Sequence, residues 1–322
     1  MKRLILIVLA LVAVFGYAAT KVQAQVSPDV IYGDDDRLDL WQVKNFRLKQ
    51  LADSTVALFK AGDIQMSGGK AKLTVASYAE ELQLCKEEPF FDQVTGAFCS
   101  GSLVGPDLMM TAGHCVRTED ACKGVRFVFG FGIKEQGVLP REVPASDVYS
   151  CAKIVGRMEE GEGADYAIVK LDRKVTGHKP LQLNRAGVVA KDTPLFVIGH
   201  PAGLPTKVAG GAKVRDASPE GFFVANLDTY GGNSGSAVFN ATTGLVEGIL
   251  VRGENDYVWK GGCRVSNKCP AEGCRGEDVT KVGQVTSLVP QAAGRTVKFK
   301  GVTPALSELV SSAKAKTEDL GL

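Results

Sequence analysis

The apolar residues of this chain are grouped in short runs that are separated by Gly, Pro, Asn and Asp. Most runs are as long as a β-strand and too short for an ordinary helix. Glycine, with 37 of the 322 residues, supplies the tight turns that short strands need. The pattern predicts an all-β protein. The expected strands lie in the runs Leu103-Val104, Val125 to Phe131, Tyr166 to Leu171, Leu195 to Ile198, Phe222 to Ala225, Ala237 to Phe239 and Val246 to Val251.

The segment Arg173 to Asp192 is the best candidate for an internal boundary, because it contains Gly and Pro and few aromatic residues. We therefore expect one unit over residues 51–180 and a second over residues 181–292. Residues 293–322 form a C-terminal tail, in which Pro304 to Lys316 has the pattern of one amphipathic helix. Repeats of a short fixed period are absent from the sequence.

The first 24 residues have the composition of a secretory signal peptide. Lys2 and Arg3 precede the apolar run Leu4 to Phe15, and small residues occupy the positions that a signal peptidase reads. The run is about 12 residues long, shorter than the ~20 of a spanning helix, which makes a retained anchor the weaker alternative. We expect a secreted or periplasmic product without a membrane anchor. Residues 25–50 are then an N-terminal segment or a propeptide.

The nearly balanced charge argues against nucleic acid as a partner. Lys and Arg number 38 and Asp and Glu 36, so the formal net charge is only +2. A protein that binds nucleic acid without sequence preference needs a strong basic field, and the sequence has no local basic patch that would replace it. Nucleic acid is therefore not an expected partner.

Three segments carry the residue types of nucleophilic catalysis. His114 stands in Thr111-Ala112-Gly113-His114-Cys115, and Asp165 precedes an otherwise apolar strand. Ser234 follows in the Gly-rich turn Gly231 to Gly235. Small neighbours leave a serine hydroxyl accessible and allow backbone N–H groups to converge, as an oxyanion hole requires. Each residue alone has an ordinary structural explanation as a turn, packing or capping residue.

In the order His, Asp, Ser, these segments resemble the trypsin-like (chymotrypsin-fold) serine peptidases, and especially the secreted bacterial branch that includes the glutamyl endopeptidases. Subtilisin-like enzymes and α/β-hydrolases have other orders, and Ser236 replaces the last Gly of the hydrolase motif G-x-S-x-G. The resemblance covers roughly Leu51 to Pro290. It implies two antiparallel six-stranded Greek-key barrels, 51–180 and 181–292, with the active site in the cleft between them. It also implies a disulfide between Cys99 and Cys115.

The same resemblance implies a catalytic role for each residue. Ser234 would be the nucleophile, His114 the general base and acid, and Asp165 the group that orients the imidazole. The backbone N–H groups of Gly232 and Ser234 would form the oxyanion hole. The expected activity is hydrolysis of peptide bonds through an acyl-enzyme. Three alternatives are a non-catalytic secreted binding protein of the same fold, a peptidase with a preference for Glu or another residue at P1, and an esterase with little peptidase activity.

Substrate preference depends on residues near the expected S1 pocket. Asp228, followed by Thr229, occupies the position that in trypsin-like relatives holds the acid at the base of this pocket, which would favour Lys or Arg at P1. The alternative is a carboxylate that is satisfied by local backbone in the turn and faces away from the pocket. The glutamyl endopeptidases use a histidine where this chain has Leu250, which weakens a preference for Glu. Leu250, Val251 and Gly253 belong to the strand that pairs with extended substrate in the family.

Activation is expected to differ from that of the vertebrate digestive members. In those enzymes a freed apolar N-terminus pairs with an Asp immediately before the nucleophile, whereas this chain has Asn233 there. An amide offers no charge to pair, so activation of this kind is not expected.

The eight cysteines are expected to form disulfides in an exported protein. After Cys99 and Cys115 the six others permit fifteen pairings. A zinc site at Cys263, Cys269 and Cys274 is the weaker alternative, because the chain has only three His. We expect no metal or organic cofactor, polypeptide substrates and a monomer.

Overall fold

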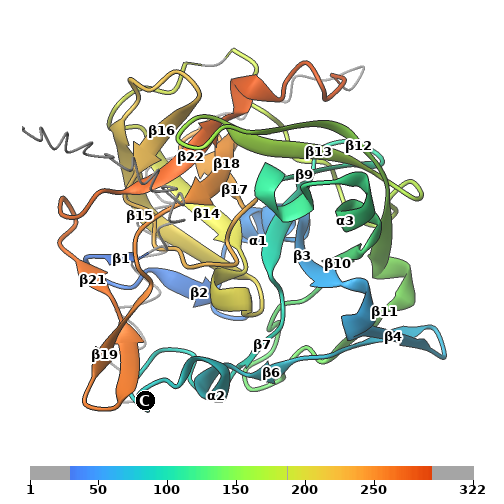
Figure 1. Ribbon diagram of the computed structural model, residues 1–322, viewed down its shortest axis with the longest axis horizontal. Helices are drawn as coiled ribbons and strands as arrows, with labels where there is room; N and C mark the ends of the chain where they lie inside the picture. The colour runs from blue at the N-terminus through green and yellow to red at the C-terminus, as the bar shows by residue number, and fades with distance from the viewer. Residues whose placement is uncertain (1–29, 187, 292–322) are drawn as a thin grey trace, which may run out of the picture.

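The computed structural model describes residues 30–186 and 188–291 (Figure 1). The predicted signal peptide, residues 1–24, lies outside the described residues. So do the first residues of the expected segment 25–50 and the expected tail 293–322, including its helix.

Six antiparallel strands close the first barrel in the order β10-β12-β13-β9-β8-β3. Strand β13 pairs with β12, which precedes it in the chain, and with the more distant β9, so the barrel joins segments that are far apart in the sequence. The strands are β3 (Thr55–Lys60), β8 (Cys99–Leu103), β9 (Leu108–Thr111), β10 (Val125–Phe129), β12 (Val148–Glu159) and β13 (Asp165–Leu171).

The second barrel has the order β14-β17-β18-β22-β16-β15 and is closed by a β14–β15 pairing. One further strand, β2 (Arg37–Asp39), is added to the outer side of β15. The six barrel strands are β14 (Pro194–Gly199), β15 (Lys207–Asp216), β16 (Phe222–Ala225), β17 (Ala237–Asn240), β18 (Val246–Arg252) and β22 (Glu277–Lys281).

Both barrels have the same internal order, in which the first strand pairs with the second and the fourth, and the sixth pairs with the third and the fifth. Figure 1 shows them side by side, the first in blue to green and the second in yellow to orange. The predicted all-β class with two six-stranded barrels is therefore confirmed. The predicted apolar runs coincide with strands or strand ends, from β8 to β18.

Apolar packing holds the two barrels as one body. One buried cluster fills the first barrel and continues across the interface, where it includes Phe196 and Ile249 of the second barrel. Phe196 stacks on Phe239 at 4.8 Å between ring centroids. A separate cluster around Phe223, Val238 and Leu250 fills the second barrel. Most residues of β13 are buried, because this strand borders both the barrel interior and the interface.

Short elements cover the ends and edges of the barrels. Helix α1 (Phe46–Ala52) begins at Asn45, whose side chain accepts the N–H groups of Arg47 and Leu48, a capping arrangement that asparagine favours. The other elements are α2 (Tyr78–Leu82), α3 (Glu119–Lys123), β1 (Ile31–Tyr32), β4 (Ile64–Ser67), β5 (Lys70–Leu73), β6 (Ala76–Ser77), β7 (Val94–Thr95), β11 (Glu142–Pro144), β19 (Tyr257–Lys260), β20 (Cys263–Ser266) and β21 (Lys268–Cys269).

All eight cysteines form disulfides. The Cys99–Cys115 bridge is present, as the resemblance implies. The three other bridges are Cys85–Cys263, Cys122–Cys151 and Cys269–Cys274. Cys263, Cys269 and Cys274 therefore belong to two different disulfides and do not form a zinc site.

Within residues 30–186 and 188–291, none of the helices has the length and apolar character needed to cross a membrane.

His200, which follows β14, is a buried residue of the fold. It is 1% exposed, and its Nδ1 lies 3.0 Å from the carbonyl oxygen of Leu204, to which it donates. Burial, with a smaller effect of nearby Lys207, lowers the pKa of His200 to about 3. The unfolded chain has a histidine pKa of about 6.5. Below this pH the unfolded state gains a proton that the folded state does not, so the free energy of unfolding falls as the pH falls from 6.5 towards 3.

We predict that His200→Asn makes the protein less sensitive to acid. The Asn amide keeps a donor for the Leu204 carbonyl and does not titrate. Between pH 7.5 and 4.5 the wild type should lose about 2 kcal/mol more of its free energy of unfolding than the variant. Urea titration with the disulfides intact measures this difference. An equal loss in both proteins would contradict the assignment of a buried, neutral imidazole.

Candidate active site

His114 lies on the 3₁₀ turn Gly113–Val116, directly after β9, and Asp165 is the first residue of β13. His114 Nδ1 is 2.6 Å from Asp165 Oδ2. The other carboxylate oxygen, Oδ1, accepts the N–H groups of Gly113 at 2.5 Å and of His114 at 3.2 Å. A carboxylate only accepts hydrogen bonds, so Nδ1 carries the proton and Nε2 is left as the basic nitrogen. Asp165 is 4% exposed, whereas the imidazole is partly exposed.

Gly113 is required by this packing. A Cβ atom at this position would lie 2.1 Å from the carbonyl oxygen of Met158 and 2.9 Å from Asp165 Oδ1. Any larger residue would therefore push the turn away from the carboxylate. The glycine in the His114 motif thus allows the backbone itself to bind Asp165.

Asp165 is also held by the second barrel. Thr280, on β22, accepts the backbone N–H of Asp165 at 3.0 Å and donates to the carbonyl oxygen of Asp165 at 2.9 Å. Thr280 is fully buried. One hydroxyl therefore satisfies both backbone groups of the residue that orients the imidazole, and it does so across the barrel interface.

Ser234 belongs to the loop between β16 and β17, which we call the Ser234 loop (residues 226–236). Ser234 is partly exposed, whereas its neighbours Asn233 and Ser236 are buried. Gly232 and Gly235 have φ angles of +97° and +91°, a region that glycine adopts without strain. A Cβ at Gly235 would lie 2.1 Å from the carbonyl oxygen of Ser100. The two glycines thus let the loop turn sharply against the first barrel.

Ser100, on β8 of the first barrel, fixes the peptide orientation in this loop. Its backbone N–H donates to the carbonyl oxygen of Ser234 at 2.8 Å, and its hydroxyl donates to that of Gly232, also at 2.8 Å. The hydroxyl in turn accepts the N–H of His200 at 3.0 Å. Within the described residues the N–H groups of Gly232 and Ser234 donate to no protein group. The predicted role of these two groups as an oxyanion hole stays a prediction.

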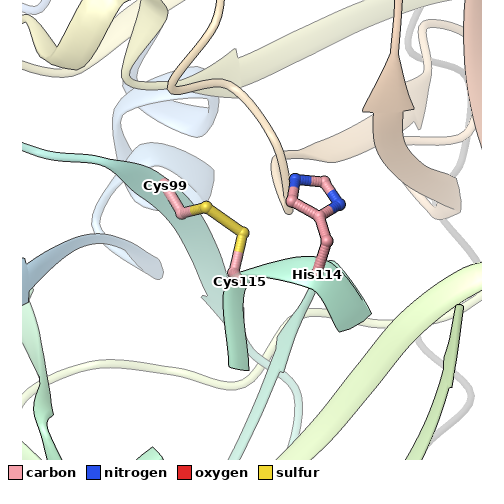
Figure 2. Close-up of side chains that lie close together, drawn as sticks. All are labelled: Cys99, His114 and Cys115. Carbon is pink, nitrogen blue, oxygen red and sulfur yellow. A yellow bond between two sulfur atoms is a disulfide. The ribbon is translucent and has the colours of Figure 1, made fainter. Parts of the chain in front are cut away.

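The disulfide Cys99–Cys115 joins β8 to the His114 turn and contacts the Ser234 loop. Figure 2 shows His114 on the same turn as Cys115, with its imidazole beside the disulfide. Cys115 Sγ is 3.7 Å from the carbonyl oxygen of Ser234. The ligand atoms of Cys99, His114 and Cys115 lie within 4.8 Å of one another, a spacing suited to a metal. Both sulfurs are bonded to each other, so they offer no thiolate, and the cluster has a structural explanation.

Asp228 and Thr229 belong to the Ser234 loop, and both are buried. Asp228 is 3% exposed, and its two carboxylate oxygens accept the N–H groups of Tyr32 at 2.8 Å and of Asp36 at 2.9 Å. Burial raises the pKa of Asp228, and the N–H groups of Asp36 and Tyr32 oppose this shift because they favour the charged form. Thr229 is fully buried and donates to Glu277 Oε2 at 3.3 Å. This is the alternative arrangement, a carboxylate satisfied by backbone, although the donors come from the distant N-terminal segment.

The predicted substrate-binding strand contributes core residues. Leu250 is 1% exposed in the second-barrel core, and Val251 is 2% exposed at the interface between the barrels. Leu250 accepts the N–H of Gly235 at 2.8 Å and donates to the carbonyl of Ser236 at 3.0 Å. Its backbone therefore supports the Ser234 loop from behind. Gly253 follows the end of β18 and is also buried.

A hollow of about 450 Å³ opens beside Gly232. Asp228, Thr229, Leu250, Val251 and Gly253 do not contribute to its lining. The residues that line it include Leu82, Phe98, Gly203, Gly232, Tyr257 and Arg264. The open space next to the candidate oxyanion site thus has walls from α2, the start of β19 and the loop after β14, and not from the predicted S1 residues.

Comparison with known proteins finds a family model that matches part of the chain. Residues 99–249 match the family model of the trypsin-like peptidase domain. The matched region contains His114, Asp165 and Ser234, and the match supports a peptidase. The glutamyl endopeptidase branch is not distinguished by it and remains a prediction.

Two further comparisons complete this result. The search of curated proteins finds no match. Among solved structures, the VesB protease of Vibrio cholerae is 16% identical, with a TM-score of 0.45; the alignment covers 80% of this chain and 66% of that chain. This chain therefore spans less than two thirds of the length of that protease.

Sequence reasoning did not find Ser100, Thr280 or Tyr32. A serine or threonine whose hydroxyl bridges two barrels has no local motif, since its partners are more than 100 residues away in the sequence. Tyr32 acts through its backbone N–H, which every residue except proline has. The only available signal was the Ser in Cys99-Ser100-Gly101-Ser102, a strand residue beside the expected disulfide.

We predict that Thr280→Val lowers stability and loosens the His114–Asp165 pair. Valine has a similar shape but leaves the N–H and C=O of Asp165 unpaired in the interior, which should cost about 2 kcal/mol. Chemical denaturation measures this cost, and the NMR signal of the proton between His114 and Asp165 reports the pair. Thr280→Ser keeps the hydroxyl and is the matched control. Identical behaviour of the two variants would show that the hydroxyl is not needed.

Proposed function

We propose that this protein is a secreted serine endopeptidase in which His114, Asp165 and Ser234 form the catalytic triad. One arrangement carries the proposal. An imidazole whose tautomer is fixed by a buried carboxylate lies on a turn that contacts the Ser234 loop. Two backbone N–H groups of that loop have no acceptor among residues 30–186 and 188–291. A general base, a nucleophile and an oxyanion site are the three parts that acyl transfer requires.

In the first half of the reaction, Ser234 Oγ attacks the carbonyl carbon of the scissile peptide while His114 Nε2 takes its proton. The negative charge develops on the former carbonyl oxygen, where the N–H groups of Gly232 and Ser234 stabilise it by roughly 3 kcal/mol per donor. Asp165 stabilises the resulting imidazolium through the Nδ1 hydrogen bond. His114 then donates the proton from Nε2 to the leaving amine, and the acyl-enzyme forms.

Water completes the cycle. His114 Nε2 removes a proton from the water that attacks the acyl carbon, and the oxyanion again lies against the Gly232 and Ser234 N–H groups. Collapse of this second intermediate returns the proton to Ser234 Oγ and releases the acid product. Proton transfer, attack and release are all assigned to protein groups and water, so the proposal includes no cofactor.

Export is part of the proposal. The N-terminal sequence predicts a signal peptide, and four disulfides hold the described chain. Such bridges persist in oxidising compartments. We propose that the enzyme acts outside the cytoplasm, as a monomer, on polypeptides.

The proposed enzyme prefers Lys or Arg at P1. Asp228 is buried in the Ser234 loop and Glu277 is buried beside it, and their acidic character favours Lys or Arg over Glu at P1. A direct salt bridge between a P1 side chain and Asp228 would have to displace the N–H groups of Tyr32 and Asp36. We therefore propose that Asp228 does not contact the P1 side chain. Leu250, at the position of the specificity histidine, is a core residue and gives no support to a preference for Glu.

A binding protein or an esterase would not need all the structural features described above. A binding protein of this fold would not need a buried Asp165 that fixes the His114 tautomer, nor two free N–H groups beside Ser234. An esterase would use both features, but it would not need a hollow of about 450 Å³ next to Gly232, which has room for substrate side chains. A peptidase accounts for all three observations.

We predict that Ser234→Ala abolishes hydrolysis of peptide substrates and labelling by a fluorophosphonate. Removal of the nucleophile in a comparable triad enzyme lowers kcat on the order of 10⁶-fold. Ser236→Ala is the matched control, because Ser236 is fully buried two residues away. It should keep measurable turnover and labelling. A wild-type protein with no Ser234-dependent turnover of peptides would overturn the proposed function.

We predict that a panel of peptides differing only at P1 shows a higher kcat/KM for Lys and Arg than for Glu, by at least about tenfold. In the variant Asp228→Asn the ratio between these substrates should stay within about threefold of its wild-type value, since the side chain does not touch P1. A selective loss of the Lys and Arg substrates in this variant would mean that Asp228 contacts P1 after all.

A further inference from the structure

The N-terminal segment contacts the Ser234 loop at a carboxylate. Tyr32 and Asp36 donate their backbone N–H groups to separate oxygens of Asp228, which lies six residues before Ser234. The donors are 196 and 192 residues away from Asp228 in the sequence. Asp228 is 3% exposed, so water does not compete for these bonds. Two bonds to two oxygens fix both the position and the rotation of the carboxylate.

A second contact reaches the next part of the loop. The guanidinium of Arg37 lies 4.2 Å from the ring centroid of Tyr230, within the range of a cation–π interaction. The same guanidinium is held by Asp35 through Nε at 2.9 Å and Nη2 at 2.7 Å. Tyr230 in turn accepts the N–H of Asn233 at 2.9 Å through its carbonyl oxygen. This contact therefore supports the residues immediately before Ser234.

The segment itself is firmly attached to the second barrel. Strand β2 pairs with β15, and the buried pair Asp39–Lys207 joins them at 2.7 Å. Strand β1 pairs with β21, and the Tyr32 hydroxyl donates to Glu277 at 3.3 Å. Because both ends are anchored on the barrel, the contacts to Asp228 and Tyr230 are held rigidly between them.

We propose that residues 31–39, the N-terminal brace, hold the Ser234 loop in the shape that forms the oxyanion hole, with Asp228 as the positioning residue. The inference rests on the proposed function and states how its site is maintained. Asn233, directly before Ser234, accepts the Ser236 hydroxyl through its side chain and the Ser236 N–H through its backbone carbonyl, and it has no charge for an inserted amino terminus. The brace makes such an insertion unnecessary, since its donors are backbone N–H groups inside the chain.

A brace and a segment that blocks the substrate site have opposite effects on activity when they are weakened. A segment that occupied the substrate site would inhibit, and weakening it would raise activity. A brace supports the oxyanion hole, so weakening it lowers kcat for every substrate and changes KM little. None of the residues that line the hollow beside Gly232 belongs to residues 31–39, which agrees with a brace.

The experiment compares Asp228→Asn with Glu247→Gln. Asparagine replaces one acceptor oxygen of Asp228 by a donor, which opposes a backbone N–H. Glu247 is also a buried carboxylate of the second barrel, and it accepts the side-chain amides of Asn184 and Asn240 instead. We expect Asp228→Asn to lower kcat by about 100-fold, similar to the loss of one oxyanion donor. Glu247→Gln should stay within about threefold of the wild type.

A second readout does not depend on catalysis. Hydrogen exchange is measured in the Ser234→Ala background with and without Asp228→Asn. We expect faster exchange at Asn233, Gly235 and Ser236, whose N–H groups are bonded within or behind the loop. Exchange in β13 of the first barrel should not change. If the wild type hydrolyses no peptides, the proposed function fails, but this measurement still tests the brace.

If Asp228→Asn does not fold, the variant Arg37→Met provides a second test of the brace. It removes the contact with Tyr230 and leaves the Asp228 bonds in place, so a smaller loss of kcat, about tenfold, is expected. Unchanged kcat and unchanged exchange in the folded variants would overturn the proposal. A rise in activity, or a loss confined to KM for Lys and Arg substrates, would overturn it as well.

Discussion

Each barrel of this protein fixes polar groups that belong to the other. Thr280 of the second barrel satisfies the backbone of Asp165 in the first, and Ser100 of the first barrel orients the peptides of Gly232 and Ser234 in the second. Buried polar groups that lose a partner cost about 1–3 kcal/mol each. The barrels therefore cannot shift relative to one another without breaking bonds at the candidate site. The geometry that the proposed chemistry needs is thus maintained by the interface and not by either barrel alone.

The sequence was sufficient for features with a local signature. Strand-length apolar runs located most barrel strands, and short motifs singled out His114, Asp165 and Ser234. The structure brings the first two together and sets Ser234 in the adjoining loop. Contacts between distant segments had no such signature. Fifteen pairings were possible for six cysteines, and only folding decides that Cys85 meets Cys263. The donors of Asp228 are backbone groups, which carry no sequence information at all.

The N-terminal segment illustrates why residue position and residue role can differ. Aligned by its distance from Ser234, Asp228 is a specificity residue. In the structure its carboxylate is an acceptor for the N–H groups of Tyr32 and Asp36, and space for a ligand side chain opens elsewhere, beside Gly232. A buried acid has few stable arrangements, because it must either be paired or accept several hydrogen bonds. Here the chain supplies those bonds from its own backbone.

The long sequence separation of the brace has a consequence for the order of folding. Pairings within the first barrel, such as β8 with β9, join residues close in sequence, whereas Tyr32 and Asp228 are 196 residues apart. Closing a loop of that length carries a larger entropy cost, and non-local contacts form late in folding. The oxyanion site would then be completed only after nearly the whole described chain has been assembled. Under the proposed function, a partly folded chain would be a poor hydrolase, so its own unfolded segments would be protected from it while the polypeptide matures.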